Sequence, residues 1–408
     1  MTLLDDQSSV VIVGAGLAGW RLAEALRSEA FTGTITIVGE EAHFPYDRPP
    51  LSKQVLSGKW DVALTTLVPD QSLVAQSIDW RLGARAVALD ACEREVTLDD
   101  GVVLRASHVA LATGSRARTM SYSAAEALHL IRSRDDLERL LADLETTESK
   151  RPWVVIGAGF LGAEVATAFK IRGVASVVLE VAHAPLEGVV GAQAASWLRM
   201  LPEDFGVTLR TDEKVRDVEW RGKVLTVSLD SGEDVEAAGV VVCVGSQLDL
   251  TWLEGSGLEL DGGVVVDEHL QASANVAALG DVARFAWPGP LGVEMLRIEH
   301  WEVAVFHAAQ LARYWTHGVG PEHVMVPYFW SDQYGKKIQM LGHPRPDDEV
   351  TLVHGDVTSK QWLALYARDE IVTGLLALSS PRPLMLAKVV LDEVTSRDHA
   401  LERAPWRV

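Results

Sequence analysis

The chain has 408 residues, of which 48% are hydrophobic, and this is enough for two or three domains with sizeable cores. Its formal charge of −20 argues against nucleic acid or an anionic membrane as a partner. No apolar run approaches the ~18 residues of a membrane span, and the acidic start MTLLDDQ predicts no signal peptide. Two cysteines far apart, Cys92 and Cys243, indicate a reducing cytoplasm. Both fall in β-like runs and are expected in the core.

A strand, a glycine-rich turn and a helix are predicted in succession near the N-terminus. The apolar β-run Val10–Val13 leads into a G-x-G-x-x-G turn at Gly14, Gly16 and Gly19. In a dinucleotide-binding turn the first glycine makes the bend, the second admits a pyrophosphate, and the third lets the helix pack on the strand. Such a match alone is weak. Glu40 strengthens it, because it ends a second β-run 26 residues after Gly14 and can accept hydrogen bonds from ribose hydroxyls.

The same pattern occurs a second time in the middle of the chain. The β-run Trp153–Ile156 is followed by Gly157, Gly159 and Gly162, and Glu180 ends the next β-run 23 residues after Gly157. Two complete mononucleotide-binding units predict two bound dinucleotides. A carboxylate at position 180, with no Arg or Lys close behind it, favours the free 2′-hydroxyl of NADH over the 2′-phosphate of NADPH.

A stiff, charged loop follows the first unit. Three prolines in the segment His43–Lys53 are expected to exclude a helix and impose an extended, irregular path. Its cations Arg48 and Lys53 would then be held at fixed positions beside the nucleotide fold. The alternative is an ordinary proline-rich surface connection.

Small residues end three further predicted strands. Thr113 and Gly114 follow the run at 108–112, Gly245 follows the run at 239–244, and Gly280 and Asp281 follow the run at 275–279. Such positions allow a cofactor to approach the backbone closely. Asp281 could accept a hydrogen bond from a ribitol hydroxyl or could simply be a turn residue.

The last third of the chain contains an aromatic segment and a change of composition. His300 and Trp301 precede a helical stretch that runs to about Tyr314. Two interpretations are open: the pair lines an aromatic cofactor, or it begins a partly buried helix. From about Pro321 the sequence becomes aromatic and β-rich. This change predicts a separate α+β domain.

Seven motifs occur together in one order: GAGLAG with Glu40, YDRPPLSK, the ATG turn, GAGFLGAE with Glu180, LGD, RIEHW and FWSDQYG. Over nearly the whole chain they resemble the FAD-dependent NADH:ferredoxin reductases of bacterial oxygenase and cytochrome P450 systems, the putidaredoxin reductase and rhodocoxin reductase type. The resemblance implies an α/β, glutathione-reductase-like fold with two Rossmann-type dinucleotide-binding domains and a C-terminal α+β domain. We expect an FAD-binding domain at 1–114 and 246–320, an NAD-binding domain at 115–245 and the C-terminal domain at 321–408.

Motifs and resemblance together give the candidate site. The FAD-binding set is Gly14, Gly16, Ala18, Gly19, Glu40, Arg48, Lys53, Val87, Thr113, Gly114, Arg132, Gly280, Asp281, Glu299, His300 and Trp301. The NADH-binding set is Gly157, Gly159, Phe160, Leu161, Gly162, Glu164, Glu180 and Gly245. The catalytic residues implied by the resemblance are Lys53, Glu164 and Trp330. Lys53 would lie against the flavin and pair with Glu164, and Trp330 would face the iron–sulfur partner. No metal site is expected.

The implied activity is electron transfer from NADH through FAD to a [2Fe–2S] ferredoxin, by a cytoplasmic protein that is a monomer or a weak homodimer. The absence of a cysteine pair argues against a disulfide reductase. Two alternatives stay open at this point: a rubredoxin reductase, and an NADH-sensing flavoprotein of the apoptosis-inducing-factor type.

Two segments depart from the family pattern. The stretch from Ser115 to Arg132 lacks the usual Pro-Arg-x-Leu-Pro, and the residues after Trp301 read Glu302 to His307 in place of Asn-Ala-x-x-Gln. The first departure concerns the hinge between the nucleotide domains. The second concerns side chains near the flavin.

Overall fold

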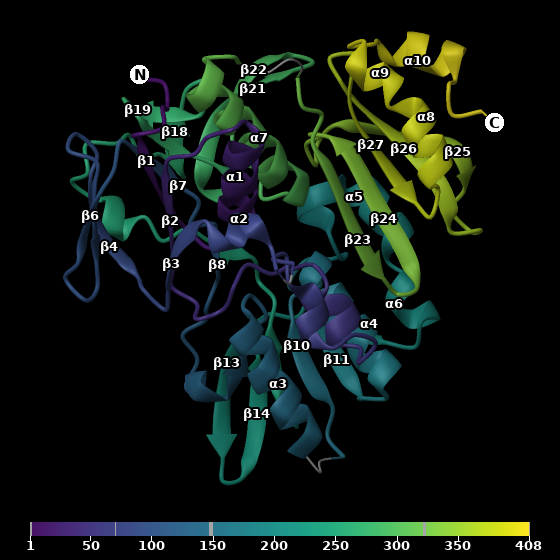
Figure 1. Cartoon of the computed structure of the whole chain (residues 1–408). Coiled ribbons are helices and arrows are strands. Elements are labelled where there is room, and N and C mark those ends of the chain that lie inside the picture. The colour runs from purple at the N-terminus through teal and green to yellow at the C-terminus, as the bar shows by residue number, and fades with distance from the viewer. Residues whose placement is uncertain (1, 70, 147–149, 321–323, 408) are drawn as a thin grey trace. The chain divides into compact units, whose positions relative to one another are not determined.

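The computed structural model describes residues 2–69, 71–146, 150–320 and 324–407, and they form two compact units (Figure 1). The first unit contains Met1–Asp47, Thr66–Arg116 and Gln247–Pro327, and the second contains Arg48–Thr65, Ala117–Ser246 and Tyr328–Val408. The short strands β8 (Arg116–Ala117) and β17 (Ser246–Gln247) lie where the chain passes between units. The predicted start of the C-terminal domain at residue 321 lies outside the described residues, and the three predicted domain boundaries stay predictions.

A six-stranded sheet forms the centre of the first unit. In order across the sheet its strands are β19 (Gln271–Ser273), β20 (Val276–Ala278), β7 (His108–Leu111), β1 (Ser9–Val13), β2 (Thr34–Gly39) and β3 (Ile78–Leu82). All neighbours are parallel except β19 and β20. The continuous apolar run Val10–Val13 is buried, as expected for a parallel strand covered on both faces. Helices α1 (Leu17–Ser28) and α7 (Trp301–His317) pack against each other.

Two smaller sheets and several short helices complete the first unit. One sheet contains β4 (Ala86–Asp90), β5 (Glu95–Leu98) and β6 (Val103–Arg105), and the other contains β18 (Val264–Val266), β21 (Ala283–Gly289) and β22 (Gly292–Leu296). The short helices are α2 (Leu73–Gln76), η4 (Thr251–Leu253) and η5 (Gly280–Val282).

The second unit contains a second parallel sheet. Its strands, in order, are β12 (Thr208–Arg210), β11 (Ser176–Leu179), β10 (Trp153–Ile156), β16 (Val240–Val242) and β9 (Leu128–His129). Helix α4 (Phe160–Arg172) starts at the glycine turn after β10 and packs on β10 and β11. The remaining helices of this part are η1 (Leu51–Val55), η2 (Val62–Thr65), η3 (Ala125–Ala127), α3 (Arg134–Thr146), α5 (Glu187–Leu198, kinked at Gly191) and α6 (Leu201–Asp204).

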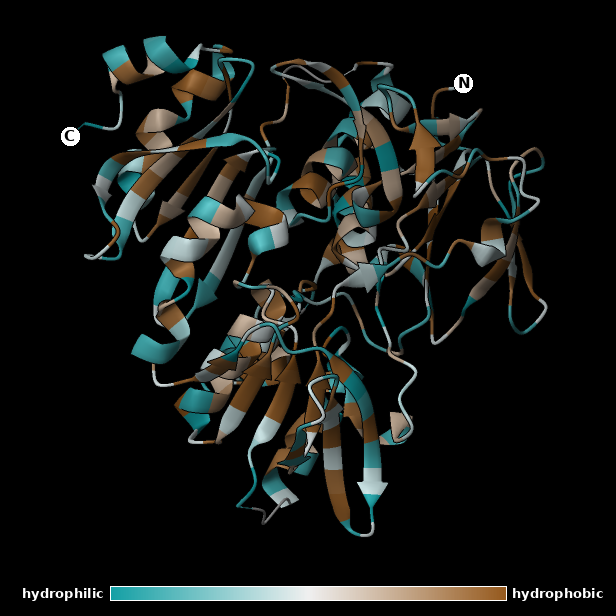
Figure 2. Cartoon of the chain, turned by 180° about the vertical axis from the view of Figure 1, so that it is seen from behind, coloured by the Kyte–Doolittle hydropathy of each residue, from teal (hydrophilic) through white to brown (hydrophobic). Residues whose placement is uncertain are grey.

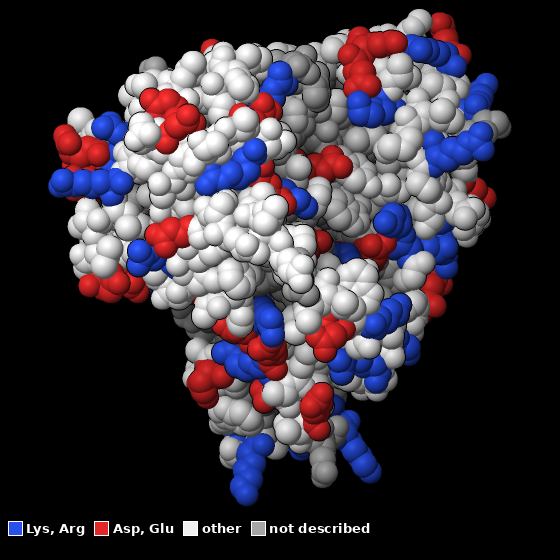
Figure 3. All heavy atoms as spheres, in the orientation of Figure 1, with Lys and Arg blue, Asp and Glu red and all other residues white. Residues whose placement is uncertain are grey.

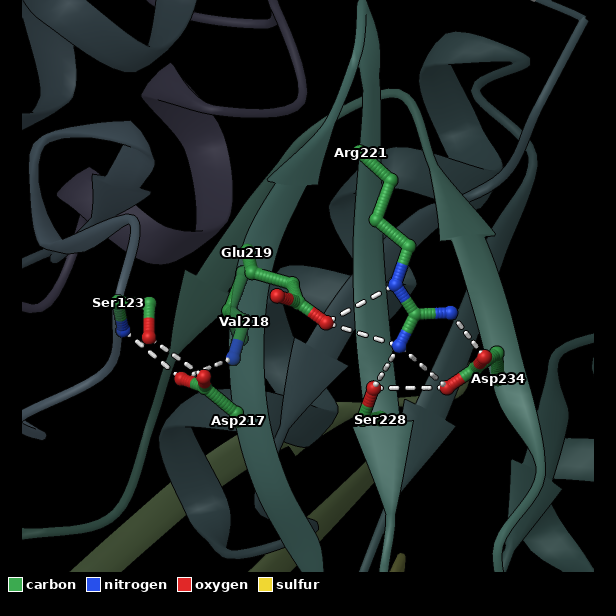
Figure 4. Close-up of polar contacts among 7 residues, drawn as sticks. All are labelled: Ser123, Asp217, Val218, Glu219, Arg221, Ser228 and Asp234. Atoms are coloured by element: carbon green, nitrogen blue, oxygen red, sulfur yellow. Dashed lines mark hydrogen bonds and ion pairs between the residues drawn. The ribbon is translucent and has the colours of Figure 1, made fainter.

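An antiparallel sheet of β13 (Val215–Arg221), β14 (Val224–Leu229) and β15 (Asp234–Ala237) anchors the hinge segment that departs from the family pattern (Figure 4). The Asp217 carboxylate accepts hydrogen bonds from both the N–H and the hydroxyl of Ser123. These bonds lower the pKa of Asp217. On the same sheet Arg221 pairs with Glu219 and reaches Asp234 on β15. The hinge is therefore fixed to the second unit at Ser123.

The C-terminal part of the second unit is an antiparallel sheet covered by short helices. The strands, in order, are β23 (Tyr328–Gln333), β24 (Lys336–Gly342), β27 (Ile371–Leu378), β26 (Gln361–Arg368) and β25 (Glu349–Asp356), followed by α8 (Pro381–Ala387), α9 (Val389–Asp392) and α10 (Arg397–Arg403). Strand β23 packs on helix α4. This contact joins the α+β part to the second glycine turn.

Hydrophobic residues concentrate on the central strands of these sheets (Figure 2). None of the described helices is long and apolar enough to cross a membrane.

Two expectations from the sequence were wrong in detail. The proline-rich loop does not stay irregular to Lys53, because a π-helical turn begins at Leu51; Pro50, with φ −67°, already has the backbone angle that a helix start requires. Cys92 is exposed and not in the core, because it lies in the turn after β4, where its N–H is bonded to the Asp90 side chain. Cys243 is buried, as expected.

Candidate nucleotide and electron-transfer site

The first glycine turn has the backbone that the motif predicts. Gly14 has φ +124°, and a Cβ there would lie 2.1 Å from the Ala112 carbonyl oxygen, so no other residue fits. A Cβ on Gly19 would lie 2.0 Å from the Gly14 oxygen, because α1 packs directly on the turn. A Cβ on Gly16 would meet no atom within 4 Å. The second glycine therefore faces open space at the N-terminus of α1, as a phosphate-binding turn requires.

Glu40 stands at the carboxyl end of β2 in a small charged network. Its carboxylate pairs with Arg116 at 2.7 Å and lies 3.9 Å from Arg85. Both arginines also contact Asp249, at 3.5 and 3.1 Å. The Glu40 side chain is half exposed, so its ion pairs are open to solvent and can be exchanged for ribose hydroxyls.

The turn that carries Asp281 is held from two sides. Ser115 Oγ lies within hydrogen-bonding distance of the carboxylates of Asp281, at 3.2 Å, and Glu299, at 3.3 Å. Arg297 pairs with Glu299 and donates to the Asp281 carbonyl oxygen. This polar group joins the ends of β7 and β20 to the segment before α7.

His307, on the buried face of α7, also contacts the turn that carries Asp281. Its Nδ1 accepts a hydrogen bond from the Gly280 N–H at 3.3 Å, and its ring meets Phe285 edge-to-face. Burial lowers the pKa of His307 to about 3. The ring is therefore neutral at ordinary pH and can act as an acceptor.

The other predicted FAD residues lie in both units. In the first, Gly114 follows β7 with φ +66°, Trp301 Nε1 donates to Asp47 at 2.9 Å, and Val87 is exposed on β4. In the second, Arg48 donates to the Arg132 carbonyl oxygen. The meeting of these two groups at one cofactor stays a prediction.

The second glycine turn repeats the first in its backbone. Gly157 has φ +99°, and a Cβ there would lie 2.5 Å from the Cys243 carbonyl oxygen. A Cβ on Gly162 would lie 1.9 Å from the Gly157 oxygen, whereas one on Gly159 would meet nothing within 4 Å. Gly245, after β16, also has a positive φ of 96°. This turn too leaves its second glycine open to a phosphate.

Glu180 is bound to the turn that it follows. Its Oε2 accepts the Ala158 N–H at 2.6 Å, and its Oε1 accepts the Ala182 N–H at 2.9 Å. Both oxygens keep a further lone pair for a ligand. The carboxylate is therefore fixed in place beside the glycine turn.

A buried ion pair joins η1 to helix α4, which begins at the second glycine turn. Lys53 Nζ is 2.9 Å from Glu164 Oε2, and both side chains are mostly buried. This is the pair that the resemblance implies. Nearby Cys243 is no nucleophile, because burial raises the pKa of its thiol to about 12.

Sequence reasoning missed several polar partners of the site. Ser115 directly follows the ATG turn, and this position was a signal that could have identified it. His307 falls in the segment that departs from the family pattern, but the sequence did not show what its ring contacts. In the described part of the chain, no group of three or more His, Cys, Asp or Glu is arranged to hold a metal ion.

Comparisons with known proteins agree with this geometry. The family model described as pyridine nucleotide-disulphide oxidoreductase matches residues 8–308, and the one described as reductase C-terminal matches residues 328–404. The chain is 33% identical to rhodocoxin reductase of Rhodococcus erythropolis, over 94% of this chain and 89% of that one. It is 31% identical to the ferredoxin–NAD(+) reductase component of the biphenyl dioxygenase system of Paraburkholderia xenovorans, over 93% and 92%.

Among solved structures, the chain is similar to the crystal structure of the covalent putidaredoxin reductase–putidaredoxin complex. The TM-score is 0.89, with 27% identity and 98% of each chain covered. These findings confirm the resemblance and the predicted fold class.

Proposed function

We propose, from the premise that the chain belongs to the pyridine nucleotide-disulphide oxidoreductase family, that it is an FAD-containing reductase. It passes electrons from NADH to a [2Fe–2S] ferredoxin that serves a cytochrome P450 or a Rieske oxygenase. The observation that carries this proposal is the pair of glycine turns, each with an open second glycine and its own terminal carboxylate. The names of the similar reductases support the ferredoxin as acceptor.

The first unit offers the residues that hold the adenosine and pyrophosphate of FAD. The N-terminus of α1, at Gly16, receives the phosphates, and Glu40 receives the ribose hydroxyls. Asp281, held by Ser115 and by the His307-bonded turn, accepts from the ribityl chain. We assign the rest of the predicted FAD set to the same cofactor, with the FAD-binding domain at 1–114 and 246–320.

The second unit offers the NADH site, in the domain proposed at 115–245. The N-terminus of α4, at Gly159 and Phe160, receives the pyrophosphate. Glu180 is held by two backbone N–H groups and cannot turn away from a ligand. A fixed carboxylate accepts from a 2′-hydroxyl and repels a 2′-phosphate, so NADH is preferred over NADPH.

Lys53 and Glu164 are the charged residues assigned to the flavin ring. When bound, FAD supplies the conversion of a two-electron hydride into single electrons for the ferredoxin. Lys53 places a positive charge beside the ring, where negative charge develops on reduction, and Glu164 keeps the ammonium in position. No side-chain nucleophile is needed.

The ferredoxin is assigned to the side of Trp330, whose ring stacks on Tyr328 at 5.8 Å on strand β23. On the face shown in Figure 3, acidic and basic side chains are interspersed. A docking patch for an acidic ferredoxin must therefore be local, and charge changes within it should alter the association rate. Two unpaired cysteines support the cytoplasm as the location, and we infer a monomer or a weak homodimer.

The test is an anaerobic titration of the purified yellow protein with NADH and, separately, with NADPH. Rapid bleaching of the flavin by NADH, reversed by added [2Fe–2S] ferredoxin, supports the proposal. Reversal by rubredoxin and not by ferredoxin identifies a rubredoxin reductase. A long-lived charge-transfer band that ferredoxin does not discharge identifies an NADH-sensing flavoprotein.

A further inference from the structure

Glu164 is a buried carboxylate that two distant segments of the chain contact. Its Oε2 accepts from Ser52 Oγ at 2.6 Å and pairs with Lys53 at 2.9 Å, both on η1. Its Oε1 accepts from Ser331 Oγ at 2.5 Å, on strand β23 of the C-terminal sheet. A buried charge is tolerated only when it is paired and hydrogen-bonded. Here the helix of the NADH turn supplies the charge, and two other segments supply its partners.

Strand β23 directs Ser331 toward α4 and Trp330 away from it, because successive side chains alternate in direction. Phe329 lies on the same face as Ser331, and the centroid of its ring is 4.3 Å from the centroid of the Phe160 ring. Trp330 stacks on Tyr328 on the opposite face. The motif FWSDQ thus places an aromatic residue and a carboxylate-binding hydroxyl on opposite faces of one strand.

The register between strand and helix is fixed at three points. Phe160, Glu164 and Thr167 share one face of α4, because they are spaced by about one and two helical turns. The first two contacts are those of Phe160 and Glu164 with β23. The third is a hydrogen bond of 2.8 Å that Thr167 Oγ1 accepts from the Tyr334 N–H. The contacts on either side of Ser331 hold its hydroxyl at Glu164.

The direction of the Ser331 hydrogen bond is also determined. Gln333 Nε2 lies 3.3 Å from Ser331 Oγ and donates to it. The hydroxyl hydrogen is therefore free to point to Glu164 Oε1. Ser331 is fully buried, so water does not replace this donor.

We propose that Ser331 and Ser52 are positioning residues for the reductase. They hold the Glu164 carboxylate in one orientation, and through it they hold the Lys53 ammonium. The inference rests on the proposed function only where it places Lys53 against the flavin. It gives Ser331 a role in flavin reduction by NADH that is separate from that of neighbouring Trp330.

The experiment is a double-mutant cycle with Ser331→Ala, Glu164→Gln and the double variant, in the purified full-length protein with FAD. Three readouts are taken: the rate of flavin reduction by NADH, the midpoint potential of the flavin, and the urea midpoint of unfolding. Ser331→Ala is expected to slow flavin reduction about tenfold, because a hydrogen bond to a charged group is lost, and to lower the flavin potential. The double variant is expected to reduce its flavin less than about twofold more slowly than Glu164→Gln alone.

A matched control is Ser380→Ala, which removes another buried serine hydroxyl of the C-terminal part, bonded to the Leu378 carbonyl oxygen. It should leave the flavin potential and the reduction rate unchanged. Ser52→Ala should act in the same direction as Ser331→Ala, since it removes a donor from the same carboxylate.

The inference is overturned if Ser331→Ala behaves like Ser380→Ala, or if its full effect persists in the Glu164→Gln background. Failure of the proposed function gives a different result. In that case NADH does not reduce the wild-type flavin, while the urea midpoints still show that the effects of Ser331→Ala and Glu164→Gln depend on each other.

Discussion

The two glycine turns have nearly the same backbone but use their terminal carboxylates differently. Gly14 and Gly157 both have positive φ, and a Cβ on Gly19 or Gly162 would lie 2.0 or 1.9 Å from the carbonyl oxygen of its first glycine. Glu40, however, is half exposed and pairs with arginine side chains. Glu180 instead accepts two backbone N–H groups, one of them within its own glycine turn.

This difference shows that the glycines dictate the shape of the turn, whereas surrounding segments decide what the carboxylate does. Glu40 can exchange solvent-exposed partners for a ligand. Glu180 is part of the turn itself, so its loss should damage the protein as well as ligand binding.

The prediction with the largest expected effect tests the backbone conformation that the two glycine turns share. Gly14→Ala places a Cβ 2.1 Å from the Ala112 oxygen at φ +124°, so it should lower the free energy of unfolding by about 3 kcal/mol or more. Gly16→Ala, two residues on, meets no protein atom and should leave that free energy nearly unchanged while weakening FAD binding. Urea unfolding without added FAD, and FAD titration, measure the two effects. Equal destabilisation by both variants would contradict the assignment of Gly16 to the cofactor.

The second prediction concerns the pH dependence of stability in the first unit. The first unit contains His307 and His108, whose pKa values burial lowers to about 3 and about 4. Below about pH 6.5 an unfolded histidine binds a proton that these folded ones do not, so stability falls as pH drops through that range. At pH 5 each should reduce the free energy of unfolding by about 2 kcal/mol relative to neutral pH.

His307→Gln should remove its share of this acid-dependent loss and keep an acceptor for the Gly280 N–H. The measurement is urea unfolding at pH 5 and pH 7.5. The control is His183→Gln in the second unit, where the side chain is exposed. An unchanged pH dependence in the His307 variant would show that the ring is not a buried neutral acceptor.

The third prediction compares how much Glu180 and Glu40 each contribute to stability. Glu180→Ala leaves the buried Ala158 N–H without its partner, so the free energy of unfolding should fall by about 1–3 kcal/mol, and the KM for NADH should rise. Glu40→Ala removes solvent-exposed ion pairs and should change stability by less than about 1 kcal/mol. Urea unfolding and steady-state kinetics check both. A larger loss of stability from Glu40→Ala would reverse the comparison.

Much of this molecule could be predicted because its signals are local. Strand, glycine turn and helix follow one another within about twenty residues, so the positions of Gly14, Gly157 and both carboxylates were visible in the sequence. The strand before Asp281 was also predicted correctly, because its apolar run ends abruptly at Gly280.

The partners of these residues could not be predicted, because they come from distant segments. Ser331 is 167 residues from Glu164, and Ser115 is 166 residues from Asp281. No periodicity or spacing links such pairs. The arginines around Glu40 were missed for the same reason, and they decide how that carboxylate differs from Glu180.

The smallest expected effect concerns Arg116. Its guanidinium pairs with the Glu40 carboxylate at 2.7 Å, so Arg116→Ala should free the carboxylate and strengthen FAD binding, by less than about threefold at low salt. At about 1 M salt the difference should vanish, because exposed charges are screened over a few ångströms. Fluorescence titration of FAD-free protein at two salt concentrations measures it, with Arg85→Ala, 3.9 Å from Glu40, expected to act more weakly. If Arg116→Ala weakens binding at both concentrations, Arg116 contacts the cofactor itself, and the first turn then uses an arginine where the second uses backbone N–H groups.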